Sequence, residues 1–313
     1  MNWIDKLSAI EPLEDADFDA ALVAAMQEAA AARGGLSSIR FSTPTFKEYT
    51  TSEIQGCGKN SFPAFSVTAG ACALDCDHCQ AKILEPMIPA TTPEMLDAKV
   101  RDLVLLQDLQ GFLLSGGSNR RNEIKYEKYY PVIEKLKRDF PHLKIAIHSA
   151  LLDERRARLM ESAGVDTAMM DVIGLHYGRL LGEANALDIC ARHGIHSLVL
   201  VVVMPFYARA GMFVTPSAHD VGHIFLEARQ RLAEKPVLLG CARPPGMHKR
   251  IVDAYAVMAG LDGIAFPAEG VIGVCEGIGR PFEQQHACCS IKVGGSFDPR
   301  AKSTCVAESA VAG

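Results

Sequence analysis

Three cysteines in the stretch Cys72-Ala-Leu-Asp-Cys76-Asp-His-Cys79 have the types and spacing that most clearly indicate chemistry in this chain. They directly follow the apolar run over residues 62–70, so we expect them on a loop that leaves a buried strand. A short loop of this kind can wrap three thiolates around three corners of a [4Fe–4S] cube. The fourth iron then has no protein ligand, so the spacing predicts a cluster with one iron open to a small molecule.

Two other interpretations of these cysteines fit the spacing less well. A zinc site would need a fourth Cys or His in a C-x2-C or H-x3-H pairing. His78 lies inside the C-x2-C spacing, where it is badly placed to supply that ligand. Three cysteines that serve only for packing would not be set so closely along the chain.

Composition restricts the fold and the partners. The chain has 313 residues with 49% hydrophobic content, which is enough for one large α/β core. The net charge is −5 without a basic stripe, so we expect no nucleic-acid partner. The longest apolar run, residues 198–206, is too short to span a bilayer, and the first residues lack the features of a signal peptide. Ten cysteines without an export signal predict a cytoplasmic iron–sulfur protein.

Elements alternate along most of the chain. Strands are expected over residues 62–69, 111–115, 144–148, 166–173, 197–204, 236–241 and 262–266, with helices between them. Because each strand is a continuous apolar run, they favour a parallel sheet covered by helices. We therefore predict an α/β fold, a (β/α) TIM-type barrel of about seven strands, full or partial. Its expected parts are an N-terminal helix and irregular arm (1–60), the barrel (61–270) and an irregular, cysteine-containing C-terminal tail (271–313).

In such a barrel the functional residues collect at the C-terminal ends of the strands. The second strand ends in Ser115-Gly116-Gly117-Ser118, where paired glycines allow close approach to a ligand or form an ordinary turn. The third ends in His148, which is either a site residue or a structural histidine.

A second group of cysteines lies late in the chain. Residues 236–240 lead into Cys241-Ala-Arg243, which would direct a thiol and a guanidinium toward the barrel mouth. Cys288 and Cys289 are adjacent, so they are either metal ligands or simply two thiols. We expect Cys241, Cys288 and Cys289 to hold a second cluster. The other cysteines fit less well: Cys57, Cys275 and Cys305 as further ligands, and Cys190, in mid-helix, as a packing residue.

In combination, these motifs resemble the radical S-adenosylmethionine (SAM) superfamily, and within it the biotin-synthase-like lipoyl synthases that act as a pair of proteins. The similarity spans residues 38–295 and is carried by residues 65–87, 114–121, 170–174, 240–244 and 287–290. The single-chain lipoyl synthases have a C-x4-C-x5-C set near the N-terminus, which this sequence lacks.

The resemblance implies a SAM-binding [4Fe–4S] cluster on Cys72, Cys76 and Cys79 and an auxiliary iron–sulfur cluster. It also implies sulfur insertion into an octanoyl chain, through a 5′-deoxyadenosyl radical. The octanoyl chain would be carried on a lysine of a lipoyl-accepting protein. Implied partners are a second radical SAM subunit and an electron donor such as ferredoxin or flavodoxin.

The resemblance also suggests roles for single residues. Residues 115–118 stand where the superfamily has a "GGE"-like motif that holds the SAM amino group, although Ser118 replaces the acidic residue. Gly174, Gly178 and Glu183 lie in a segment like the one that contacts the adenosyl group; alternatively, they form a loop and the start of a helix. Arg243 and His148 are the expected catalytic residues.

One departure from the family pattern has a structural consequence. Val172-Ile-Gly174 joins Leu175-His-Tyr-Gly178 directly, whereas the family pattern has a further helix and strand between these pieces. The sequence therefore predicts that one α/β unit is missing, in agreement with seven strands. Two other functions stay open: a biotin-synthase-like radical SAM enzyme without sulfur insertion, and a non-catalytic iron–sulfur subunit that stabilises a catalytic partner.

Overall fold

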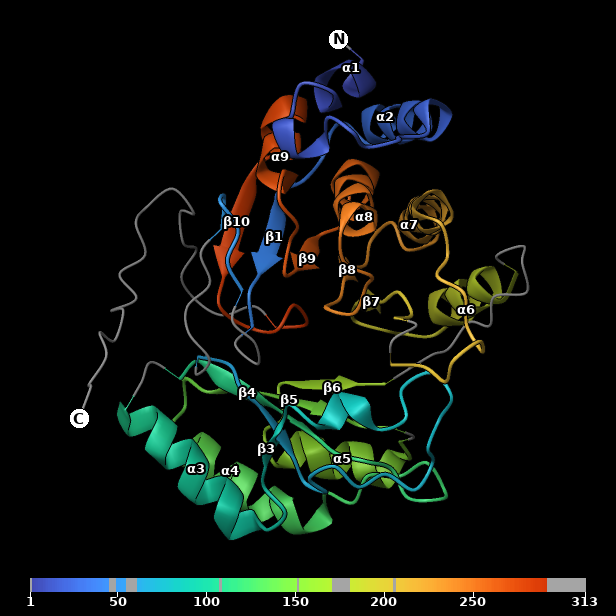
Figure 1. Cartoon of the computed structure of the whole chain (residues 1–313). Coiled ribbons are helices and arrows are strands. Elements are labelled where there is room, and N and C mark those ends of the chain that lie inside the picture. Colours follow the sequence, from blue (N-terminus) through green and yellow to red (C-terminus); the bar gives the residue numbers. More distant parts are fainter. Residues whose placement is uncertain are drawn as a thin grey trace, which may run out of the picture.

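All ten strands of the described chain are parallel to their neighbours and form two five-stranded sheets (Figure 1). The computed structural model describes residues 2–44, 49–54, 61–106, 109–150, 152–170, 181–204 and 207–291. The first sheet has the order β10-β1-β9-β8-β7, with β1 (Ile39–Ser42), β7 (Leu198–Leu200), β8 (Val237–Leu239), β9 (Gly263–Ala265) and β10 (Phe282–Gln285). The second has the order β3-β2-β4-β5-β6, with β2 (Ala64–Ser66), β3 (Ile88–Pro89), β4 (Gly111–Ser115), β5 (Lys144–His148) and β6 (Thr167–Met169).

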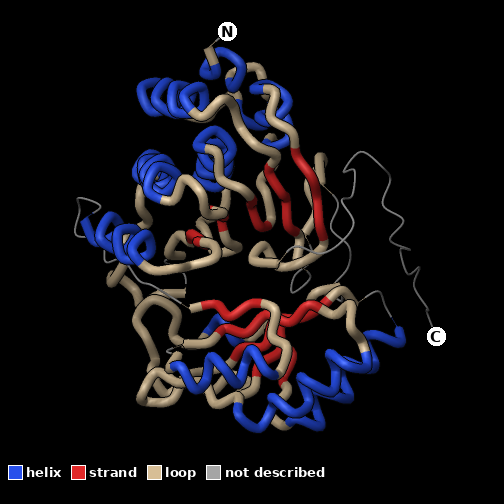
Figure 2. Tube along the Cα trace, turned by 180° about the vertical axis from the view of Figure 1, so that it is seen from behind, coloured by secondary structure: helices blue, strands red, loops and turns tan. Residues whose placement is uncertain are grey.

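Helices flank each sheet, and the C-terminal ends of β1 and β10 point toward the second sheet (Figures 1 and 2). Beside the first sheet lie α6 (Leu181–Arg192), α7 (Ala218–Arg231), α8 (Met247–Ala259) and α9 (Val271–Ile278). α1 (Trp3–Leu7) and α2 (Ala20–Ala32) pack against α7, α8 and α9, beyond the N-terminal ends of the strands. Beside the second sheet lie α3 (Pro93–Leu106), α4 (Tyr130–Asp139) and α5 (Glu154–Ser162). Short 3-10 turns lie at Glu11–Leu13, Lys82–Leu84 and Glu127–Tyr129. Parallel strands joined by outer helices make this fold a partial TIM-type barrel, as predicted.

The segment 287–291 joins the two halves from the inside. Ala287 and Ile291 pack with Phe62 and Ala146 of the second half, whereas Cys289 packs with Ala265 and Phe266 of the first. Within the described residues, β6 and β7 share no ladder, so the sheet is open there. The junction predicted to lack an α/β unit, residues 172–178, falls between these two strands and lies outside the described residues.

All seven predicted strands are present, as β2, β4, β5, β6, β7, β8 and β9. Three further strands were missed, and two lie in segments that were expected to be irregular. β1 belongs to the predicted arm, yet it pairs with both β9 and β10, and its Ile39 and Phe41 side chains are fully buried. Strand β10 and helix α9 belong to the predicted tail. β1 and β10 were missed because charged and polar residues interrupt them, whereas the predicted strands lie in longer apolar runs.

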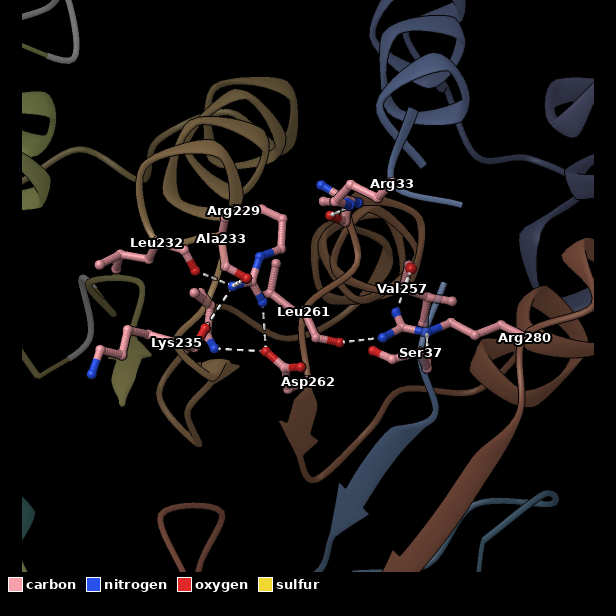
Figure 3. A network of polar contacts seen from close by, with 12 residues as sticks. Arg33, Ser37, Arg229, Leu232, Ala233, Lys235, Val257, Leu261, Asp262 and Arg280 are labelled. Atoms are coloured by element: carbon pink, nitrogen blue, oxygen red, sulfur yellow. Dashed lines mark hydrogen bonds and ion pairs between the residues drawn. The ribbon is translucent and has the colours of Figure 1, made fainter. Parts of the chain in front are cut away.

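Buried arginines tie together the chain just before the strands of the first sheet (Figure 3). Arg229 ion-pairs with Asp262 at 2.6 Å, and Asp262 also accepts the backbone N–H of Val237. Arg280 donates to the carbonyls of Ser37, Val257 and Leu261, and burial lowers the pKa of its guanidinium to about 10. This end of the sheet is therefore fixed by structural contacts, which leaves the opposite, C-terminal ends of the strands for chemistry.

No helix in the described ranges is both long enough and apolar enough to cross a membrane.

Candidate active site

The cysteine loop begins at the C-terminal end of β2, as the sequence predicted. Ala69 has a left-handed φ of 51°, and its carbonyl accepts a hydrogen bond from the Ser66 hydroxyl at 2.6 Å, so the chain turns sharply after the strand. Farther along, the N–H groups of Cys79 and Gln80 both donate to the Cys76 carbonyl. Cys72, Cys76 and Cys79 are each half-buried on this folded loop.

The three thiols influence one another electrostatically. Burial raises the pKa of the Cys76 thiol, and the negative charges of Cys79 and Cys72 raise it further. A bound cation would reverse this effect, because it stabilises thiolates. Partly exposed thiols on one loop are the donor set that iron–sulfur clusters use, so the residues fit the predicted cofactor. Within the described residues, no three His, Cys, Asp or Glu side chains are already grouped as they would be around a metal ion.

The pair Gly116-Gly117, which follows β4, provides the surface on which the cysteine loop lies. A Cβ atom on Gly117 would be 1.9 Å from the Ala71 carbonyl oxygen and 2.6 Å from the Cα of Cys72. The Ala73 N–H donates to the Ser118 carbonyl at 2.8 Å, and the Gly117 N–H donates to the Thr68 hydroxyl at 2.7 Å. These glycines therefore allow the close approach of the loop itself.

The predicted contact of Ser115, Gly116, Gly117 and Ser118 with the SAM amino group stays a prediction. The Ser115 side chain is buried, and its carbonyl accepts the Val67 N–H at 2.9 Å. The Gly117 N–H and the Ser118 carbonyl already hold the loop, so any ligand contact would add to this role.

We expect Gly117→Ala to displace the cysteine loop, because the backbone atoms that the new methyl group would meet cannot move independently. The clash should cost about 1–3 kcal/mol of stability and lower the iron retained after anaerobic reconstitution. Gly70→Ala is the matched control, since a Cβ there meets nothing within 4 Å. Equal iron content in the two variants would contradict this assignment.

A cavity of about 720 Å³ opens beside Cys72. Its lining includes Gly117, Ser118, Glu123 and Lys128. Glu123 is held by Arg156 at 2.9 Å and by the Asn119 side chain, and these contacts lower the pKa of its carboxyl. The volume lies within the usual range for a small-molecule site.

Other predicted site residues lie around the strand ends. His148 ends β5 and is half-buried, and its carbonyl accepts the Tyr126 hydroxyl at 2.8 Å. Glu183 lies in the first turn of α6. Gly174 and Gly178 lie outside the described residues. The catalytic and adenosyl-binding roles of these four residues stay predictions.

The structure brings Cys241, Cys288 and Cys289 together between the sheets. Cys241 follows β8, and both Cys241 and Cys288 pack against the cluster that contains Cys289 and Phe266. Hydrogen bonds from the thiol of Cys289 and from Ser290 lower the pKa of Cys288. The same contact with Cys288, burial, and the charges of Cys288 and Cys241 raise the pKa of Cys289. The predicted second ligand set is therefore close in space, in a buried environment.

The remaining cysteines are separate from this group. Cys190 is buried in α6, in agreement with its predicted packing role, and Cys275 is buried in α9 within the first core. Cys57 and Cys305 lie outside the described residues.

The prediction that Arg243 points into the barrel mouth is wrong. Its guanidinium is buried and forms a two-pronged ion pair with Asp253 at 2.6 and 2.8 Å. It also donates to the carbonyls of Gly240 and Phe266. Because its guanidinium already donates to these partners, Arg243 stabilises the chain next to Cys241 and is not placed to bind a substrate.

Sequence reasoning missed one partner of the cysteine loop. Arg209 ion-pairs with Asp75 and Asp77, although it lies 132 residues after Asp77. No motif surrounds Arg209, so only the fold reveals the contact.

No protein-family model matches the chain, and no curated protein sequence matches it. Three solved structures show weak similarity. A single-substitution mutant of FabK from Thermotoga maritima is 13% identical, with a TM-score of 0.34 over 67% of this chain and 63% of that chain, so the match spans less than two thirds of it. Dihydropteroate synthase from Xanthomonas albilineans, in complex with indole-2-carboxylic acid and 6-chloroguanine, is 15% identical (TM-score 0.30; 59% and 83% covered). The YdjI aldolase from Escherichia coli K12 is 8% identical (TM-score 0.26; 78% and 80% covered). Similarities this weak carry no argument about function.

Proposed function

We propose that this chain is a radical SAM enzyme of the lipoyl synthase type, which inserts sulfur into an octanoyl chain on a carrier-protein lysine. The observation that carries the proposal is the presence of two thiol sets, one in each half of the fold. One set is on the loop after β2, and the other contains Cys241, after β8, with Cys288 and Cys289 between the sheets. Two cluster sites would provide both radical generation and a sulfur source, which favours sulfur insertion over reactions that need one cluster.

When bound, the clusters would supply an electron to cleave SAM into methionine and a 5′-deoxyadenosyl radical, and sulfur for the substrate carbon. The protein must hold both groups and exclude water from the reacting carbon. Cys72, Cys76 and Cys79 would hold the first cluster, and the later three cysteines would hold the second. Apolar side chains, among them Phe62 and Ile291, line part of the region between the sheets, where the Gln285 side chain also donates to the carbonyls of Cys288 and Ile291.

The proposal also defines the partners and the location. The substrate would be a lipoyl-accepting carrier protein that bears octanoyl-lysine. A second radical SAM subunit would complete the reaction, and ferredoxin or flavodoxin would reduce the cluster. Such oxygen-sensitive chemistry suits the cytoplasm.

The test uses the anaerobically reconstituted chain with its partner subunit, a strong reductant and an octanoyl-lysyl peptide. We expect 5′-deoxyadenosine and a gain of peptide mass from added sulfur, with about eight irons per chain. Cys289→Ala should keep about four irons and release 5′-deoxyadenosine, but add no sulfur. Cys190→Ala should behave as the native chain does.

Each alternative predicts a different result. Release of 5′-deoxyadenosine from the native chain without a mass gain would favour a radical SAM enzyme that inserts no sulfur. Bound iron without any SAM cleavage would favour a non-catalytic iron–sulfur subunit. A colourless protein after reconstitution would favour a zinc-binding structural role.

A further inference from the structure

A segment from the first half of the barrel contacts the cysteine loop of the second half. Residues 207–209, which follow β7, bind it through both side-chain and backbone groups. The Arg209 side chain meets the carboxylates of Asp77 and Asp75, each at 2.6 Å. The Arg209 N–H donates to the Asp77 carbonyl at 2.8 Å, and the Gln80 side chain donates to the Tyr207 carbonyl at 3.0 Å. Two elements without a common strand ladder are thereby joined at the cysteines.

The two aspartates place negative charge directly beside the cysteines. Asp75 and Asp77 flank Cys76, so each carboxylate is next to that cysteine in the chain. Asp75 also has a left-handed φ of 45°, a conformation that is uncommon outside glycine but that Asp adopts more readily than most residues. Without a cation, two carboxylates and three thiolates would repel one another on one short loop.

An arginine suits this position better than a lysine would. Its planar guanidinium presents several donors in a fixed fork, so it can bind both carboxylates at once. The side chains of Arg209, Asp75 and Asp77 are 45%, 64% and 47% exposed, so each ion pair alone contributes little to stability. The backbone bond at Asp77 and the Gln80 contact add to them, and together they fix the register between the two segments.

We propose that Arg209 is a positioning residue: it holds the cysteine loop in its cluster-binding conformation and couples that loop to the opposite sheet. The role in cluster binding rests on the proposed function. The clasp, defined as Tyr207 and Arg209 with Asp75, Asp77 and Gln80, exists in the chain without a cluster, so it can be tested separately.

The first test measures amide hydrogen exchange in the full chain without iron. In Arg209→Ala, amides of residues 72–80 should exchange roughly five- to tenfold faster than in the native chain, because the loop opens more often. Arg231→Ala is the matched control, since Arg231, on α7, also bridges two carboxylates, Asp188 and Glu227, but neither partner belongs to residues 72–80. It should leave exchange in residues 72–80 unchanged.

The second test measures the reduction potential of the reconstituted cluster by spectroscopically monitored titration. Arg209→Ala leaves two uncompensated carboxylates beside the cluster, so adding an electron becomes harder and the potential becomes more negative. Arg209→Lys should recover most of the potential, because it keeps the charge. It should not restore slow exchange, because an ammonium cannot bind both carboxylates as a fork. If Arg209 had a purely structural role, Arg209→Lys would not recover the reduction potential while amide exchange stayed fast.

The outcomes distinguish this inference from the proposed function. Native-like exchange in residues 72–80 together with a native-like potential in Arg209→Ala would overturn the inference. If the native chain binds no iron at this loop, the proposed function fails, while the exchange data still report on the clasp. Should Arg209→Ala not fold, the double substitution Asp75→Asn and Asp77→Asn provides the same exchange test from the other side. Unchanged exchange in that variant would equally overturn the inference.

Discussion

Replacement of Cys76 by alanine is expected to remove the iron held by the first cysteine loop and to lower 5′-deoxyadenosine release by more than about 100-fold. Cys76 lies at the centre of the C-x3-C-x2-C set, and its half-buried thiol is on the same loop as those of Cys72 and Cys79. Two remaining thiolates cannot hold a cube at three corners. Iron and sulfide analysis after anaerobic reconstitution, with product chromatography, measures both effects.

Cys190→Ala provides the control for this substitution. Cys190 is also a free cysteine, but it is buried in α6 and packs there. Its loss should leave iron content and product formation at native levels, at a cost of about 1 kcal/mol in stability. Equal iron content in Cys76→Ala and the native chain would show that the loop is not the cluster site.

Replacement of Asp253 by alanine is expected to lower the free energy of unfolding by about 3–5 kcal/mol. Both Asp253 and Arg243 have fully buried side chains, and the Asp253 carboxylate also accepts the Ala268 N–H at 2.7 Å. Without Asp253, the Arg243 charge stays in the core uncompensated. Urea denaturation of the full chain, followed by circular dichroism, measures the loss.

Two further variants test whether the loss of stability comes from burial of this ion pair and not simply from removal of a charge. Arg158→Ala removes an ion pair with Glu154 whose side chains are 72% and 79% exposed, so it should change stability by less than about 0.5 kcal/mol. The double substitution Arg243→Met with Asp253→Leu removes both charges and should recover much of the stability lost in Asp253→Ala. A loss below about 1 kcal/mol in Asp253→Ala would contradict the core role assigned to Arg243.

The strands that the sequence predicted correctly share one property: each is a continuous apolar run between helical segments. In β2, β8 and β9 every residue is buried, so these strands leave a clear signal in the sequence. β1 and β10 were missed because they include charged residues, Arg40 and Glu283, which pair with each other across the ladder at 2.8 Å. The residue pattern within one segment cannot reveal that Arg40 pairs with Glu283, which lies 243 residues later in the chain.

Some residues of the candidate site could likewise be predicted from the sequence, and others could not. The cysteine spacing is local, so Cys72, Cys76 and Cys79 could be identified from the sequence, and their position after a strand was correct. Cys241, Cys288 and Cys289 were also predicted as a set; the fold packs Cys241 and Cys288 against the cluster that contains Cys289, and their role as ligands stays a prediction. Arg243 and Arg209 could not be assigned, because their partners are set by tertiary packing: one guanidinium turns into the core, and the other reaches across to the opposite sheet.

The proposed function requires that Cys72, Cys76 and Cys79 hold a [4Fe–4S] cluster with an iron open to SAM. Electron paramagnetic resonance of the reconstituted, reduced chain, recorded with and without SAM, tests it most directly. We expect a [4Fe–4S]⁺ signal that changes shape when SAM is added, both in the native chain and in Cys289→Ala, and that is absent at this site in Cys76→Ala. A signal that SAM leaves unchanged, or no cluster signal at all, would contradict it.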